Sequence, residues 1–146
     1  MSAPEEPVRP TTPWVAEHEA RYAASDGADG HLWRGVPTLL LTTRGRRSGR
    51  LRRTPLIYGR DGDAYVVVGS RGGAPRHPSW YLNLSEDPDV TIQVVGDEMP
   101  ARATTAEGAR REELWSRMTE IWPDYDKYQA KTTRRIPIVV LEPVTP

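Results

Sequence analysis

Hydrophobic residues along the chain gather in short runs that glycine, proline and charged residues separate. Aliphatic and β-branched residues dominate these runs, which is typical of β-strands. We therefore predict six strands, at residues 36–43, 51–58, 64–68, 90–95, 99–104 and 136–141. Most of them follow one another directly, with a hairpin about Gly96-Asp97. This order predicts a small, mostly antiparallel barrel.

Helical spacing begins near the N-terminus. Thr12 supplies a capping hydroxyl and Pro13 suits the first helical position. Trp14, His18 and Tyr22 then recur every four residues and form one aromatic stripe. We expect this stripe to be buried against the barrel; the alternative is a lid over a ligand.

Three further helices are predicted. A short one covers residues 78–84 and stops near Pro88, and a last one starts at Pro123. Between them, Thr104 and Glu107 have the spacing of a capping box, which predicts a helix ending near Thr119. Helices added to an antiparallel barrel place the fold in the α+β class.

The length of 146 residues suits one domain. Residues 1–12 are proline-rich and acidic and are expected to form a flexible tail, leaving residues 13–146 as the single domain. Residues 1–7 lack the basic and apolar regions of a signal peptide, and no apolar run reaches the roughly 18 residues of a membrane helix. We expect a cytoplasmic protein, with peripheral contact at the inner face of the membrane through Trp14 as a further option.

The composition excludes several kinds of chemistry. Cysteine is absent, which removes disulfides, thiol catalysis and cysteine-ligated metals. His18, His31 and His77 lack the spacing of metal ligands, and no serine lies in a nucleophile elbow. We therefore expect no metal site, and the lack of a catalytic dyad suggests that a bound cofactor performs any chemistry.

Charge is unevenly distributed although the chain holds 20 basic and 20 acidic residues. Residues 44–76 contain nine arginines against Asp61 and Asp63, a net charge of +7, so the rest of the chain carries −7. Six of these arginines fall within residues 44–53, around the turn Ser48-Gly49. Guanidinium groups beside such a turn favour a discrete phosphate or carboxylate ligand.

Two other interpretations of the arginine run remain open: a solvated charged hairpin and a nucleic-acid surface. Nucleic acid normally requires a broad basic face with interleaved aromatic residues, and here the aromatic residues lie elsewhere. Within the predicted strand, Arg50 and Arg52 should share one face, with Leu51 and Arg53 on the other.

The loop at residues 69–75 contains Gly72-Gly73, which allows backbone to approach a ligand closely.

These residues resemble those of the deazaflavin-dependent nitroreductase family of actinobacteria, which includes F420H2-dependent quinone reductases. Three blocks carry the resemblance: TTRGRRSGRLRRTPL from Thr42, GSRGGAPRHPSWYLNL from Gly69 and IPIVVL from Ile136. Their order and spacing match from about residue 12 to the C-terminus. The resemblance implies a split β-barrel fold, coenzyme F420 as the cofactor and a cytoplasmic oxidoreductase.

The same resemblance implies a role for individual residues. The phosphate and acidic tail of the cofactor are implied to lie on Arg47, Ser48, Arg52 and Arg53. The strand along the deazaflavin ring is implied to hold Thr54, Pro55 and Leu56, and the loop around the ring Ser70, Arg71, Gly72, Gly73 and Ala74. Support for that loop is implied for Trp80, Tyr81 and Asn83. The substrate side is implied to hold Tyr125 and Tyr128, with Trp122 where members of the family often carry tyrosine.

The leading hypothesis is hydride transfer from reduced F420 to a quinone, nitroaromatic or enone-type acceptor. The hydroxyl groups of Ser70, Tyr125 and Tyr128 are the candidate catalytic donors to the developing oxyanion. A non-catalytic F420-binding or carrier protein is one alternative, and a split-barrel protein that binds FMN is another. We expect a small-molecule acceptor and no nucleic acid as partner, with the chain a monomer or a homodimer.

Overall fold

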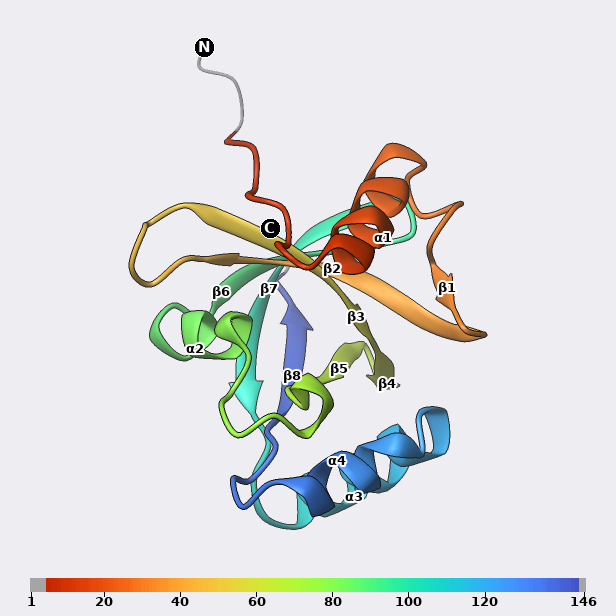
Figure 1. The fold of residues 1–146 in the computed structure, drawn as a ribbon, viewed down its shortest axis with the longest axis vertical. Helices are drawn as coiled ribbons and strands as arrows, with labels where there is room; N and C mark the ends of the chain where they lie inside the picture. Colours follow the sequence, from red (N-terminus) through yellow and green to blue (C-terminus); the bar gives the residue numbers. More distant parts are fainter. Residues whose placement is uncertain (1–4, 145–146) are drawn as a thin grey trace.

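The structure is a computed structural model that describes residues 5–144. One strongly curled sheet carries four α-helices at its sides (Figure 1). The strands are β1 (Leu32–Trp33), β2 (Val36–Arg44), β3 (Leu51–Ile57), β4 (Gly59–Asp61), β5 (Ala64–Val68), β6 (Asp89–Val94), β7 (Asp97–Thr105) and β8 (Ile138–Pro143). The helices are α1 (Pro13–Ala24), η1 (Arg71–Gly73, a 3₁₀ turn), α2 (Ser79–Glu86), α3 (Gly108–Ile121) and α4 (Asp124–Lys131).

All pairings between the strands are antiparallel. The order is β1-β2-β6-β7-β8-β5-β4, and β3 pairs with the other side of β2. Because β3 has only β2 as a strand partner, it tolerates Pro55, whose nitrogen has no hydrogen to donate to a second strand. The α+β class and the six predicted strands are confirmed; β1 and β4, two and three residues long, were not predicted.

Two apolar cores lie on opposite faces of the sheet. Side chains alternate along β5, so Val67 packs inside the barrel while Val66 and Val68 pack under α3 and α4. At the bottom of Figure 1 these two helices form one layer, whereas α1 lies against β3 at the top. None of the helices within residues 5–144 is long and apolar enough to cross a membrane.

Three helix predictions need correction. Thr12 is the N-cap residue of α1, but its hydroxyl makes no capping hydrogen bond to the helix. The capping box at Thr104 and Glu107 is wrong, because Thr104 lies in β7 opposite Val140 and α3 begins only after Glu107. The strand takes precedence because residues 101–105 of β7, Thr104 included, gain backbone pairing with β8. The aromatic stripe of α1 is not uniformly buried either: Tyr22 is fully buried, but Trp14 is 59 % exposed.

Part of the predicted flexible tail contacts the sheet. Val8 forms a parallel bridge with Arg52, and its backbone bonds to Leu51 and Arg53 in β3. Glu5 accepts a bond from the Leu51 amide at 2.7 Å. The tail segment 5–10 therefore lies along β3 on the side away from β2. The domain boundary at residue 13 stays a prediction.

Candidate active site

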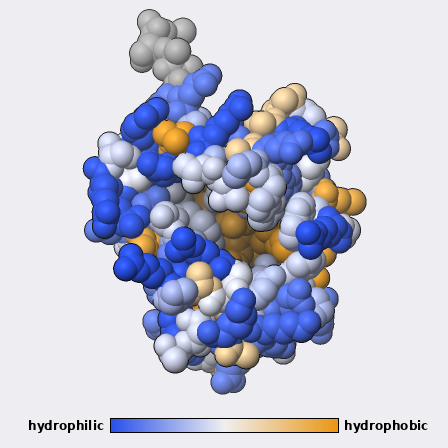
Figure 2. Space-filling view, viewed as in Figure 1, coloured by the Kyte–Doolittle hydropathy of each residue, from blue (hydrophilic) through white to orange (hydrophobic). Residues whose placement is uncertain are grey.

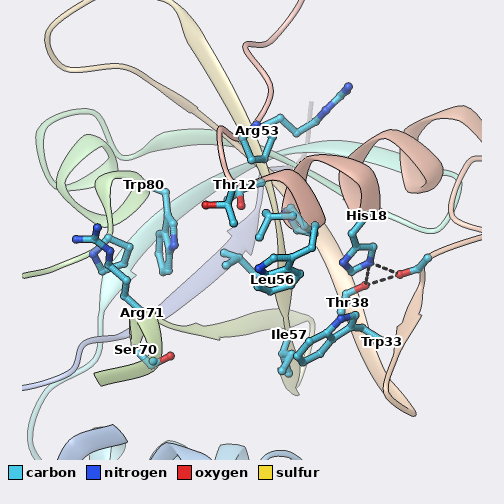
Figure 3. Close-up of a pocket in the computed structure, with 18 of the residues that line it drawn as sticks. Thr12, His18, Trp33, Thr38, Arg53, Leu56, Ile57, Ser70, Arg71 and Trp80 are labelled. Carbon is cyan, nitrogen blue, oxygen red and sulfur yellow. Dashed lines mark hydrogen bonds between the residues drawn. The ribbon is translucent and has the colours of Figure 1, made fainter. Parts of the chain in front are cut away.

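An open cleft of about 1190 Å³ lies between α1, β3, η1 and α4. Its floor is apolar and its rim is hydrophilic (Figure 2). The cleft is larger than the roughly 300–1,000 Å³ of a pocket for one small ligand, so it has room for a cofactor and a second molecule. Leu56 lies in its middle, with Arg71 and Trp80 on one side and His18 and Trp33 on the other (Figure 3).

The arginine-rich turn between β2 and β3 is anchored to α2 by Asn83. The Asn83 side chain is buried, and its Oδ1 accepts bonds from the Arg46 amide at 3.1 Å and the Arg46 guanidinium at 2.9 Å. Its Nδ2 donates to Thr43 at 3.2 Å. Asn83 therefore fixes the position of the turn at one end of the cleft.

Two more arginines of the run are engaged by carboxylates of the protein. Arg53 donates to Glu19 at 2.6 Å, and Glu19 is fully buried on α1. Arg44 pairs with Glu5 at 2.9 Å. These two ion pairs join the N-terminal part of the chain to the sheet. Arg44 and Arg53 are therefore already paired within the protein, although the sequence analysis counts both among the arginines that favour an anionic ligand.

The other three arginines of the run, Arg47, Arg50 and Arg52, have exposed side chains. Among the described residues, no carboxylate pairs with any of the three. Arg52 lines the cleft, whereas Arg47 and Arg50 lie on the turn beyond its edge. The turn therefore presents three positive charges to solvent beside the cleft, as an anion site requires.

The glycine loop owes its shape to Arg134, a residue that the sequence analysis did not select. Its guanidinium donates to three carbonyl oxygens: Ala74 at 2.8 Å, Gly69 at 3.1 Å and Ser70 at 2.7 Å. It also bonds to Nδ1 of His77 at 3.1 Å. Burial, and then the charge of Arg134, lower the pKa of His77, which keeps Nδ1 free of a proton and able to accept.

The two loop glycines serve different purposes. A Cβ on Gly72 would meet no atom within 4 Å, and this exposed residue lines the cleft with φ +62°. A Cβ on Gly73 would lie 2.7 Å from the Tyr128 carbonyl oxygen, so Gly73 allows the loop to pack on α4. Close approach to a ligand, as the sequence predicts, therefore applies to Gly72.

Hydroxyl groups also face the cleft, and Ser70 lies on the same side of it as Arg71 (Figure 3). Ser70 and Tyr125 are 9 % and 4 % exposed, and neither hydroxyl bonds to another described residue. Burial, and secondarily Tyr128, raise the pKa of Tyr125 far above its ordinary value, so its hydroxyl keeps its proton and can donate it in a hydrogen bond. The Tyr128 hydroxyl accepts a bond from Trp122 Nε1 at 3.3 Å, which leaves its own hydrogen free.

Three tryptophans from separate parts of the chain line the end of the cleft that holds His18, which we call the acceptor end. Trp33 stacks on Trp14 with ring centres 5.9 Å apart, and its centre lies 5.3 Å from that of Trp122. All three line the cleft. We call them the tryptophan wall. It offers flat apolar faces to a planar ligand.

The structure brings most of the predicted site residues together around the cleft. Those that line it are Arg52, Arg53, Thr54, Pro55, Leu56, Ser70, Arg71, Gly72, Trp80, Asn83, Tyr125 and Tyr128. Five do not: Arg47 and Ser48 lie on the turn beyond the cleft, Gly73 packs on α4, the Ala74 carbonyl bonds to Arg134 and the Tyr81 hydroxyl bonds to Thr105. Their roles toward a ligand stay predictions.

Sequence reasoning missed Glu19, Arg134 and Trp33. Arg134 lies 60 residues or more from the carbonyl groups that it binds, so no local pattern could have indicated this contact. Glu19 carried a signal: it directly follows His18 in the aromatic stripe, and a charged residue there requires a partner if the helix packs on the barrel.

The residues present fit a cofactor that carries negative charge at one end. Arg71, Gly72 and Gly73 all have positive φ. The Gly73 amide closes the turn by donating to the Ser70 carbonyl at 2.9 Å, so the exposed Gly72 backbone is the part of the loop that is open toward a ligand. Exposed arginines continue the positive charge along the turn. A curled antiparallel barrel with a cleft of this kind can hold a negatively charged cofactor beside a second, planar molecule.

The comparisons with known proteins place the chain more narrowly. The family model described as F420H(2)-dependent quinone reductase matches residues 14–143. The chain is 42 % identical over 131 residues to an F420H(2)-dependent quinone reductase of Mycobacterium tuberculosis (strain ATCC 25618 / H37Rv), covering 85 % of this chain and 86 % of the relative. The chain therefore belongs to the F420H(2)-dependent quinone reductase family.

Solved structures agree with this assignment. An F420-H2 dependent reductase, FDR-A, is 40 % identical with a TM-score of 0.67, covering 73 % of this chain and 94 % of that one. A structure described as a domain-swapped dimer is 38 % identical with a TM-score of 0.70, covering 91 % and 100 %. The split-barrel fold and the family resemblance predicted from the sequence are confirmed.

Proposed function

We propose that this oxidoreductase transfers hydride from reduced coenzyme F420 to a quinone bound against the tryptophan wall. Membership of the family supports the coenzyme and the reaction. The observation that carries the proposal is Tyr125, which is 4 % exposed and lines the cleft, and whose hydroxyl has no partner among the described residues. When bound, the reduced coenzyme supplies the hydride from a ring carbon, and the protein supplies position and charge stabilisation.

The basic end of the cleft is suited to the anionic part of the coenzyme. Arg52 lines the cleft there, and Arg47 and Arg50 extend the positive charge along the exposed turn. The Gly72 backbone is open toward the same space. Phosphate and carboxylate groups would be held by bidentate guanidinium contacts and by loop amides.

The other end is suited to the acceptor. When a quinone oxygen receives charge, a neutral hydroxyl donor that cannot ionise near pH 7 stabilises it. Tyr125 meets that requirement because burial raises its pKa. Ser70 and Tyr128 also line the cleft, and their hydroxyls are the further donors that we propose.

The reaction is tested by mixing the protein with reduced F420 and menadione and following reoxidation of the coenzyme. We expect reoxidation to depend on both protein and quinone. Nitroaromatic and enone acceptors, measured in parallel, test the wider acceptor range that the sequence analysis predicts. Reoxidation no faster than without protein, for every acceptor, would exclude the activity.

Two alternatives give different results in the same experiments. A carrier protein would bind F420 in a fluorescence titration and yet reduce none of the acceptors. A protein specific for FMN would bind FMN more tightly than F420 in parallel titrations. We expect the opposite preference, because only F420 carries an acidic tail for Arg47 and Arg52.

Peripheral contact with a membrane is a further part of the proposal. Trp14 and Leu32 are 59 % and 64 % exposed beside the acceptor end of the cleft, where an apolar quinone would enter. Exposed tryptophan favours the lipid–water interface. Sedimentation with quinone-loaded vesicles tests this: we expect binding that Trp14→Ser reduces, and no sedimentation of the wild type would contradict it.

The homodimer of the sequence analysis also stays a proposal. A structure 38 % identical to this chain is described as a domain-swapped dimer, which favours self-association here. Light scattering at several protein concentrations distinguishes a dimer from a monomer.

A further inference from the structure

His18 lies at the acceptor end of the cleft. One of its ring nitrogens is hydrogen-bonded within the protein, and the other has no partner among the described residues. Its Nε2 is 2.6 Å from the Gly30 carbonyl oxygen and 3.4 Å from the Thr38 hydroxyl. A carbonyl oxygen only accepts hydrogen bonds, so Nε2 carries the hydrogen. The second nitrogen, Nδ1, points into the cleft and bonds to no described residue (Figure 3).

The surroundings hold the ring in this orientation. Gly30 has φ +114°, and a Cβ on it would lie 3.2 Å from His18 Cδ2, so the glycine allows its carbonyl to approach the ring. The Thr38 hydroxyl donates to the same carbonyl at 2.8 Å. A histidine whose far nitrogen is fixed by an acceptor is prepared to exchange a proton at its near nitrogen.

The reaction proposed above needs such a proton. Hydride brings a quinone two electrons and one hydrogen, which leaves one acceptor oxygen with a negative charge. Tyr125 holds its proton too tightly to release it near neutral pH, because burial raises its pKa. Among the described residues that line the cleft, His18 is the only histidine, the residue type that ordinarily exchanges protons in this pH range.

Building on the proposed function, we propose that His18 is the acid that protonates the reduced acceptor. The Nδ1–H bond of the protonated ring breaks and an O–H bond forms on the acceptor oxygen. The ring is left neutral with its hydrogen on Nε2, bonded to Gly30. Water at the open mouth of the cleft then returns the proton to Nδ1.

The test compares two acceptors in two variants. Menadione requires a proton after hydride transfer, whereas the 5-methylphenazinium cation becomes neutral on receiving hydride and requires none. His18→Gln can still donate to Gly30 but cannot act as an acid. His31→Gln is the matched control, because His31 bonds to the Tyr58 hydroxyl and does not line the cleft.

For His18→Gln we expect kcat with menadione to fall about 10²–10⁴-fold, as for loss of a general acid. The rate with methylphenazinium and the F420 affinity by fluorescence titration should stay at wild-type values. His31→Gln should leave all three unchanged. Equal losses with both acceptors, or no loss with menadione, would overturn the role of His18. A wild-type protein that reduces no quinone would instead overturn the proposed function and this role with it.

A second measurement needs neither coenzyme nor acceptor. Nitrogen-15 NMR of the histidines in the ligand-free protein reports which ring nitrogen carries the hydrogen. We expect neutral His18 to be protonated at Nε2. A hydrogen on Nδ1 instead would contradict the orientation on which the proposal depends.

Discussion

The two ends of the cleft are built from different interactions. At the basic end, buried polar groups such as Asn83 hold a turn whose arginines reach into solvent. At the acceptor end, rings from three parts of the chain pack on one another, and the hydroxyl of Tyr125 faces inward. The first arrangement attracts charge over a distance, and the second selects shape at contact.

The difference separates two tasks of one enzyme. Exposed charges bring an anionic cofactor to the site, and their effect weakens as salt screens them. Buried donors and aromatic faces act on the acceptor, and salt affects them little. Variants at the two ends should therefore change different measured quantities, and the following predictions test this separation from the largest effect to the smallest.

Of the variants that follow, the one without the Tyr125 hydroxyl should show the largest effect. In Tyr125→Phe we expect kcat for quinone reduction to fall about 10²–10³-fold, because the developing oxyanion loses a preorganised donor. Affinity for F420 should not change. The control is Tyr81→Phe, whose hydroxyl bonds to Thr105 away from the cleft. A fall in both variants would place the effect in stability rather than in catalysis.

Charge removal at the basic end should act on the cofactor. In Arg47→Ala/Arg52→Ala we expect the Kd for F420 to rise about 10- to 100-fold at low salt, because the coenzyme loses one or two charge-assisted hydrogen bonds. The rise should shrink as salt is added. Arg44→Ala/Arg60→Ala removes the same charge away from the cleft and should change the Kd far less. Equal effects of the two pairs would mean that only net charge matters.

The glycine loop at residues 69–75, which the Arg134 guanidinium holds, connects the basic end of the cleft to the acceptor end. We call the contacts of Arg134 with its carbonyl groups the clamp. In Arg134→Met we expect the Kd for F420 to rise about tenfold, because the loop carbonyls lose charged hydrogen bonds and the Gly72 backbone is no longer held at the cleft. Hydrogen exchange at the amides of Ser70 and Gly72 should accelerate. The neighbouring exposed Arg135→Met is the control. Unchanged exchange in Arg134→Met would show that the loop holds its shape without the clamp.

The tryptophan wall should affect the acceptor alone. In Trp33→Ala we expect KM for menadione to rise about 3- to 10-fold, because the quinone loses one aromatic face to stack on. Neither added salt nor the F420 titration should distinguish this variant from the wild type. A weakened F420 affinity would break the separation between the two ends.

Stability at high pH gives the smallest effect. Because burial raises the pKa of Tyr125 in the folded state, the unfolded chain loses this proton first as pH rises above 10. The free energy of unfolding should therefore decrease between about pH 9 and about pH 11. Denaturant titrations should show a smaller decrease in Tyr125→Phe. An identical decrease would assign it to other groups, such as Tyr22, whose pKa burial also raises.

Much of the fold was predictable because its signals are local. Residues 64–68 form a continuous apolar run, and apolar and polar residues alternate over most of residues 90–95. Both patterns are typical of strands, and both segments form strands in the structure. Prediction failed where a contact between distant parts of the chain outweighed the local sequence pattern. Thr104 and Glu107 have a good helix-start pattern, but β8 pairs with the backbone at Thr104 and delays the helix.

The sequence by itself determined the chemistry available: an arginine-rich turn, a glycine loop, tyrosines near the C-terminus and no thiol. Residue type and spacing carry that information, because charge, hydroxyl groups and backbone freedom belong to the residues themselves. Tertiary structure alone decided which of them are free to act. It engaged Arg53 with Glu19 and left Arg52 exposed, and it placed His18 on the acceptor side. Such pairings depend on contacts between residues distant in the chain, which no local pattern contains.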